Sequence, residues 1–182
     1  MSASGRGERG FTLIEVTLAI VIGVVVIAGA TVLYQQAKRS AGNTAAQQKT
    51  MALGAIIEEF AARTHDYPTH AQLRSIWKRT RPNDYMSNPW GGLMGANGTA
   101  PGVEGIAMGG GPFSDPWTHE SFNNPDYAGV TLYYKAATAG ETKVVTDYES
   151  ETTRAYRGYV LGIFNRDGFG PYYVVGRPAD SP

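Results

Sequence analysis

The N-terminal region reads GFTLIEV at residues 10–16 and continues as the apolar run VTLAIVIGVVVIAGATVL at residues 16–33. No charged side chain interrupts this run, and its only polar side chains are two threonines. Extended to Tyr34 as a helix, it would be about 28 Å long at 1.5 Å per residue, close to the roughly 30 Å hydrocarbon core of a bilayer. The sequence therefore predicts a membrane-spanning helix near the N-terminus.

A cleaved secretory signal and an uncleaved anchor are the alternatives for this run. The apolar region of a signal is shorter and ends in a small-residue cleavage site, whereas this run continues into YQQAKR at residues 34–39. Glu15 points to a more specialised segment, because an acid at the centre of a spanning helix costs roughly 2.5–3.5 kcal/mol and usually has a partner. The simpler interpretation places Glu15 at the lipid headgroups, where an acid suits the positive end of the helix dipole.

The leader MSASGRGERG and the residues after it resemble the prepilin signature of type IV pilins and type II secretion pseudopilins. The resemblance rests on a basic leader that ends in Gly10, an aromatic Phe11, a Thr-Leu-Ile run and an acid, Glu15, at the fifth position after the cut. It implies that a membrane-embedded aspartyl peptidase cuts between Gly10 and Phe11 and N-methylates Phe11. It also implies that Glu15 pairs with the Phe11 ammonium of a neighbouring subunit, because an unpaired buried charge is strongly penalised.

The same resemblance implies an α+β pilin fold, in which a long N-terminal helix packs against a C-terminal antiparallel sheet. The N-terminal half of this helix would span the membrane. We expect a leader at residues 1–10, a transmembrane and filament-core helix at 11–38, and a globular head at 39–182 that contains a helix continuation at 43–64, a Gly/Pro-rich loop at 83–128 and an antiparallel sheet at 129–176.

Periodicity supports this organisation from the residues themselves. Leu53, Ile56, Ile57 and Phe60 recur at i, i+3, i+4 and i+7, the spacing of one helix face, so we expect them in the core under the sheet. Upstream of them, Gly42-Asn43 is a candidate interruption of the helix. Alternating segments predict strands at 129–135, 143–148, 156–164 and 169–175, with turns at 138–141 and 165–168.

A second, short helix is predicted after a capping-box pattern that begins at Thr69. Its apolar residues fall on one face, and its other side carries Arg74, Lys78, Arg79 and, just beyond the helix, Arg81. These cations suit a solvated helix face. A DNA-binding strip is the alternative, but exposed aromatic residues are not interleaved with the cations, and the chain has 16 basic and 16 acidic residues. We therefore do not expect nucleic acid as a partner.

No catalytic motif stands out, so we expect no enzyme activity; a membrane-tethered hydrolase is the alternative from another class. The chain has no cysteine, which excludes thiol catalysis and disulfides. Asp115, Asp126 and Asp167 carry hard oxygens that suit Ca²⁺, and the resemblance implies calcium because major pseudopilins use a calcium loop where pilins use a disulfide. Their spacing is not that of an EF-hand, and no other cofactor is expected.

The function implied by the resemblance is that of a structural subunit of a type IV pilus-like filament, with a pseudopilin of a type II secretion system as the alternative. Implied partners are other pilin subunits, the prepilin peptidase, an inner-membrane assembly platform and membrane lipid. The implied location is a single-pass inner-membrane protein with a cytoplasmic N-terminus and a periplasmic head, then a filament at the cell surface or in the periplasm. Basic residues flank both ends of the apolar run, so the positive-inside rule does not set this orientation.

Overall fold

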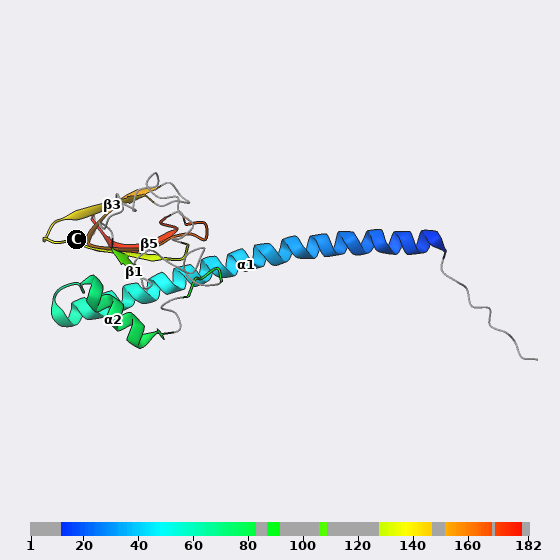
Figure 1. Cartoon of the computed structure of the whole chain (residues 1–182). Coiled ribbons are helices and arrows are strands. Elements are labelled where there is room, and N and C mark those ends of the chain that lie inside the picture. Colours follow the sequence, from blue (N-terminus) through cyan, green and yellow to red (C-terminus); the bar gives the residue numbers. More distant parts are fainter. Residues whose placement is uncertain are drawn as a thin grey trace, which may run out of the picture. The chain divides into compact units, whose positions relative to one another are not determined.

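The computed structural model describes residues 12–82, 87–91, 106–108, 128–146, 152–168 and 170–179. Their elements, in chain order, are α1 (Leu13–Thr64), α2 (His70–Thr80), β1 (Ile106–Met108), β2 (Thr131–Lys135), β3 (Thr142–Thr146), β4 (Thr153–Ile163) and β5 (Tyr173–Pro178) (Figure 1). Internal contacts divide the chain into two units, Met1–Ser40 and Ala41–Pro182. The first unit contains the N-terminal part of α1, and the second contains the rest of α1 with α2 and the sheet.

In the first unit, α1 exposes its apolar side chains all around the helix. The two threonines of the apolar run do not disturb this surface, because each hydroxyl donates to the helix backbone. Thr17 Oγ1 donates to the carbonyls of Leu13 and Ile14, and Thr31 Oγ1 donates to that of Ile27. A hydroxyl bonded in this way leaves no unsatisfied donor in an apolar surrounding.

In the second unit, α1 is unbroken, so the interruption considered at Gly42-Asn43 does not occur. The side chain of Trp90 instead packs against these two residues. A Cβ on Gly42 would lie only 2.2 Å from Trp90 Cδ1, and Trp90 Nε1 donates to Asn43 Oδ1 at 2.8 Å. Nearby, Lys49 Nζ donates to the Ser87 carbonyl at 2.9 Å. Residues 87–91, which we call the clasp, are thus fixed to this part of α1.

β4 is the centre of the sheet. β5 pairs with one of its edges from Tyr156↔Pro178 to Ile163↔Tyr173. β2 and β3 share the other edge, with Thr131↔Ile163 at one end and Thr146↔Thr153 at the other. Residues 138–141 form the predicted turn, in which Glu141 N donates to the Thr138 carbonyl at 3.2 Å. Because β2 and β3 run in the same direction along β4, this turn does not join two strands that pair with each other.

Residues 136–141 form an excursion between two strands that lie end to end. Ala136 N donates to the Gly158 carbonyl at 2.8 Å, which continues the ladder between β2 and β3. The Glu141 carboxylate accepts from Ala137 N at 2.7 Å and from the Tyr134 hydroxyl, and these bonds hold the pKa of Glu141 below its usual value. The carboxylate thereby closes the excursion together with the backbone bond from Glu141 N to the Thr138 carbonyl at 3.2 Å.

β1 is a second departure from the expected sheet. It pairs with β2 in parallel, from Ile106↔Thr131 to Met108↔Tyr133, and it comes from the region expected to be a Gly/Pro-rich loop at 83–128. Apart from β1 and the clasp, the expected loop from residue 83 onward lies almost entirely outside the described residues. Figure 1 shows the C-terminal part of α1 and α2 on one side of the sheet.

Alternation along the strands gives the sheet two buried faces. Tyr133, Tyr159 and Leu161 face the helices and pack with Leu53, Ile57, Leu73 and Trp77. The other face carries a separate cluster of Val130, Leu132, Val145, Tyr156, Val160 and Phe164. Of the four α1 residues expected in the core, Leu53 and Ile57 are 0% exposed, whereas Ile56 and Phe60 are half-buried. Full burial of such a side chain contributes about 1.5–3 kcal/mol to folding.

The helix ends have local causes. Thr69 caps α2 through the predicted capping box, since its Oγ1 accepts from Gln72 N and its N–H donates to Gln72 Oε1. α1 ends where His65 takes a left-handed conformation, φ 59°, and its N–H donates to the Ala61 carbonyl at 2.8 Å. This is a common C-terminal cap of helices, although glycine is more usual at the left-handed position.

Candidate functional site

The candidate site is the beginning of α1. Gly10 and Phe11, the predicted cleavage and methylation residues, lie outside the described residues. Glu15 is described and exposed, and it is bound to Thr12 on its own chain. Its Oε2 accepts from Thr12 N and from Thr12 Oγ1, both at 2.8 Å, while Glu15 N donates to Thr12 Oγ1 at 3.3 Å.

This arrangement is a capping box, in which Thr12 and Glu15 satisfy each other's backbone N–H groups at the start of α1. The sequence analysis missed it, although the signal was present as the spacing Thr-x-x-Glu before an apolar run. The box leaves part of the carboxylate open. Both Thr12 donors reach Oε2, and within the described residues no hydrogen bond reaches Oε1. The free oxygen can accept from a cation without breaking the cap.

Around Glu15 the surface of α1 is apolar. Large exposed side chains follow the helix for about twenty residues: Leu13, Ile14, Val16, Leu18, Ile20, Val21, Ile22, Val24, Val25, Val26, Ile27, Val32, Leu33 and Tyr34. Among the described residues, α1 is the one helix that is long and apolar enough to cross a membrane. An apolar surface of this extent is stable in water only when lipid or other protein covers it.

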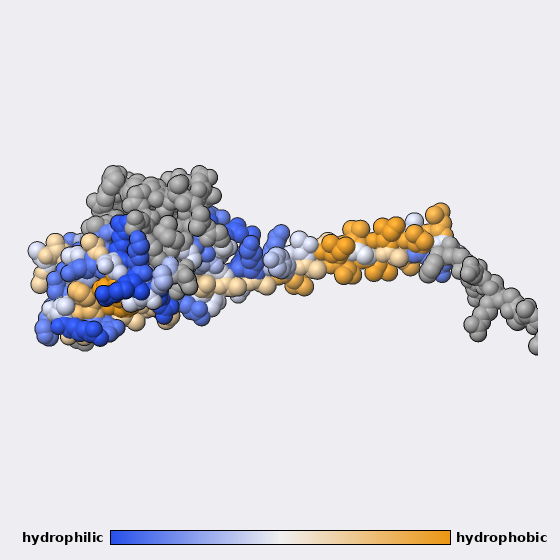
Figure 2. Space-filling model, turned by 60° about the horizontal axis from the view of Figure 1, so that its bottom comes forward, coloured by the Kyte–Doolittle hydropathy of each residue, from blue (hydrophilic) through white to orange (hydrophobic). Residues whose placement is uncertain are grey.

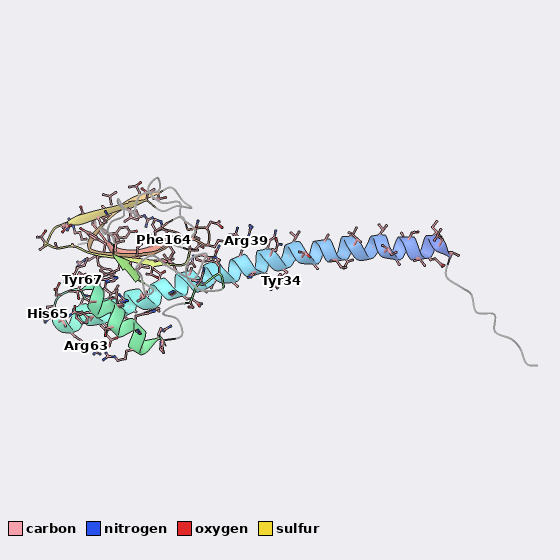
Figure 3. All side chains as sticks on the ribbon, viewed as in Figure 1. Tyr34, Arg39, Arg63, His65, Tyr67 and Phe164 are labelled. Atoms are coloured by element: carbon pink, nitrogen blue, oxygen red, sulfur yellow. The ribbon has the colours of Figure 1, made fainter. Side chains whose placement is uncertain are left out.

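A second cluster of polar contacts holds the turn between α1 and α2, where Figure 3 labels His65 and Tyr67, against the sheet. Tyr133 donates its hydroxyl to the Pro68 carbonyl at 2.7 Å. Lys135 Nζ donates to Asp66 Oδ2 at 2.7 Å and to the Tyr67 carbonyl at 2.8 Å. The hydrogen bond from Lys135 holds the pKa of Asp66 below its usual value, and burial raises the pKa of Tyr133 well above its own. These bonds position the turn beside an open hollow of about 460 Å³, whose lining includes Asp66, Tyr67 and Lys135.

The candidate calcium ligands are not brought together by any described contact. Asp115 and Asp126 lie outside the described residues. Asp167 sits in a turn, where its N–H donates to Asn165 Oδ1 at 2.9 Å and its carboxylate pairs with Arg166 Nε at 3.2 Å. In the part of the chain that the structure describes, no three His, Cys, Asp or Glu side chains are grouped to hold a metal ion. Calcium therefore stays a prediction.

The fold and the N-terminal segment together define a class of protein. A long N-terminal apolar helix followed by a C-terminal antiparallel sheet is an α+β arrangement that matches the pilin fold, as the resemblance implied. Residues 5–31 match the family model of the prokaryotic N-terminal methylation motif, which is the prepilin motif of type IV pilins and pseudopilins. This match confirms the resemblance and covers Gly10, Phe11 and Glu15.

No curated protein and no solved structure matches the chain. The motif supports a member of the type IV pilin or pseudopilin family. It points to a structural protein that is processed by prepilin peptidase and assembles with other pilin subunits. The apolar N-terminal helix is compatible with a single-pass membrane anchor.

Proposed function

We propose that this chain is a structural subunit of a type IV pilus-like filament. It is made as a prepilin, cut between Gly10 and Phe11 and N-methylated on Phe11. The observation that carries the proposal is the methylation motif at residues 5–31, which includes the cut and continues into the exposed apolar surface of α1. Cleavage removes the polar, charged leader and leaves a single ammonium group on Phe11, directly before Thr12.

The open oxygen of Glu15 supports a specific assembly step. When α1 helices gather in a filament, water leaves the space between them, and a lone carboxylate or ammonium there would be strongly destabilising. The Phe11 ammonium of a neighbouring subunit satisfies Glu15 Oε1, while Oε2 keeps its bonds to Thr12. The pair fixes the register of one subunit against the next because only one alignment satisfies both charges.

The apolar surface of α1 has two successive environments in this proposal. Before assembly it crosses the inner membrane once, with the N-terminus in the cytoplasm and the head in the periplasm, and an inner-membrane assembly platform extracts it. After assembly the same side chains pack against other α1 helices. The exposed apolar residues suit both surroundings because neither offers hydrogen-bonding groups.

The second candidate is a pseudopilin of a type II secretion system. The absence of cysteine favours it, because a head without a disulfide needs another constraint and a bound Ca²⁺ at Asp115, Asp126 or Asp167 would supply one. The two candidates share processing, anchoring and the Glu15 pairing. They differ in whether the filament leaves the cell.

The deciding experiment is mass spectrometry of the full-length protein from its native cells. Filaments are sheared from the surface, and their subunits are analysed for intact mass and for N-terminal fragments. We expect a chain that begins at N-methylated Phe11 in the sheared fraction. A processed chain found only in the envelope would favour the pseudopilin, and a chain that retains residues 1–10 in wild-type cells would overturn the prepilin proposal.

A further inference from the structure

A groove of about 540 Å³ lies between the last turns of α1 and the length of α2. Its apolar lining comes from Ile56 and Phe60 of α1 and from Ile76 of α2, and all three side chains are half-buried. Figure 2 shows a small apolar patch bordered by hydrophilic residues on the face of the head that carries α2. The groove is therefore a hollow with an apolar floor that the head itself leaves partly uncovered.

Each wall of the groove carries an arginine, Arg63 on α1 and Arg79 on α2. Glu59 also lines it and pairs with Arg63, but both side chains are largely exposed, at 62% and 75%, so this pair is weak and can exchange partners. Arg79 makes no ion pair with the described residues. The groove thus suits an apolar or aromatic side chain with a carboxylate on each side.

The chain contains a segment with this chemistry. Residues 147–151 read DYESE, so Tyr148 stands between Asp147 and Glu149. The segment lies outside the described residues, but the strands that it connects are described. β3 ends at Thr146 and β4 begins at Thr153, and their hydroxyl oxygens lie 3.0 Å apart. A tyrosine flanked by acids is a common anchor at interfaces, because the ring fills a pocket while arginines bind the carboxylates.

The groove and the strand ends that flank this segment belong to opposite sides of the head. Figure 1 shows β3 and α2 on opposite sides, with the rest of the sheet between them. The complementary surfaces therefore meet between copies, and a contact between two different surfaces repeats into an open helical array when it does not close into a ring.

We propose that residues 147–151 of one copy dock in the α1–α2 groove of the next copy. Tyr148 covers Ile56, Phe60 and Ile76, and its neighbouring carboxylates bind Arg63 and Arg79. This contact rests on the proposed filament function, to which it adds an interface between heads. It gives Arg79, which makes no ion pair with the described residues, a carboxylate partner.

Disulfide trapping tests this contact, because the chain has no cysteine of its own. Two full-length variants are produced in the same cell, one with Ser75→Cys in the groove wall and one with Ser150→Cys in the acidic segment. We expect an oxidant to give a disulfide-linked dimer when both variants are present and none when either is alone. Thr138→Cys, exposed in the excursion between β2 and β3, replaces Ser75→Cys as the matched control and should give no dimer.

Charge exchange tests the chemistry of the same contact. Arg79→Glu on the groove chain should abolish the dimer, as should Glu149→Arg on the segment chain. The two changes together should restore it, which a folding defect would not allow. Arg177→Glu, an exposed arginine on β5, is the matched control and should leave the dimer unchanged.

Several results would overturn the proposal. These are no dimer in membranes or in filaments, trapping of Ser75→Cys by Val32→Cys of another copy's apolar helix in place of Ser150→Cys, or Arg79-dependent binding of labelled double-stranded DNA without any dimer. Failure of the docking is distinguishable from failure of the filament function. Filaments that contain the processed chain but lack the disulfide overturn the docking alone, whereas a chain that keeps residues 1–10 overturns the filament function.

Discussion

The indole ring of Trp90 occupies the space directly against the backbone of Gly42, and its Nε1 donates to Asn43 Oδ1 at 2.8 Å. The clasp therefore contacts α1 where the head begins along the helix. Gly42 is required there for space: its φ is not in the left-handed region, but any side chain would collide with the ring.

Gly42→Ala should consequently destabilise the head. The added Cβ would lie 2.2 Å from Trp90 Cδ1, and forcing the ring away costs about 1–3 kcal/mol. This loss exceeds the gain of about 1 kcal/mol that alanine brings to a helix. Denaturant unfolding of the detergent-solubilised chain measures the change. Gly29→Ala is the control, because nothing lies within 4 Å of its Cβ, and an equal effect of both substitutions would contradict the role of Trp90.

Gly158→Ala and Gly140→Ala separate steric collision from backbone strain. Both glycines have positive φ, 73° and 94°, so each alanine carries a strain of about 1–2 kcal/mol. At Gly158 the Cβ would also meet Tyr67 Cε2 at 2.5 Å, whereas nothing lies near Gly140. We expect Gly158→Ala to lower the unfolding free energy by about 1–3 kcal/mol more than Gly140→Ala. Equal losses in thermal unfolding would show that Tyr67 can move aside.

The ion pair between Lys135 and Asp66 predicts a pH dependence of stability. The pKa of Asp66 is held below its usual value of 3.8, chiefly by the hydrogen bond from Lys135. A depressed pKa gives stability that is complete above the unfolded pKa and disappears as the pH falls through the folded pKa. The temperature at the midpoint of thermal unfolding should therefore decrease as the pH is lowered from about 5 to about 2. In Lys135→Met this acid slope should be smaller, and Asp66→Asn should have the same effect. An unchanged slope in both variants would assign the acid sensitivity to other carboxylates.

Glu15→Gln tests whether assembly needs the charge or only the helix cap. The amide oxygen of glutamine can still accept from Thr12, so the capping box remains, but no charge is left to pair with an ammonium. We expect normal removal of residues 1–10 and few or no sheared filaments. Thr12→Ala is the complementary change, since it removes the cap, at a cost of about 1 kcal/mol, and leaves the carboxylate. Abundant filaments from Glu15→Gln would remove the charge pairing from the proposed mechanism.

Local signals in the sequence predicted the features that depend on near neighbours. The methylation motif and the apolar run at residues 10–33 are continuous in the chain, and the α2 cap follows from the spacing of Thr69 and Gln72. The Thr12–Glu15 box carried the same kind of signal and was overlooked. The α+β class also followed from the resemblance that the N-terminal motif carries, with support from the predicted helix face and strands.

Features that depend on distant partners could not be predicted in this way. A glycine followed by asparagine in a helix resembles a break, and only the ring of Trp90, 47 residues from Asn43, explains why the two residues are there. The parallel pairing of β1 with β2 and the shared edge of β2 and β3 depend on contacts between segments far apart in the sequence. Strand spacing along the chain does not determine these pairings.

The central position of β4 has a consequence for how the head unfolds. Every antiparallel pair that the structure describes uses β4 as one of its two strands. β4 cannot leave without releasing β2, β3 and β5 together, so we expect its amide hydrogens to exchange with solvent only when the whole sheet opens. A protease that meets the head should then find it either intact or fully open, with no stable half-open form in which the sheet survives without its central strand.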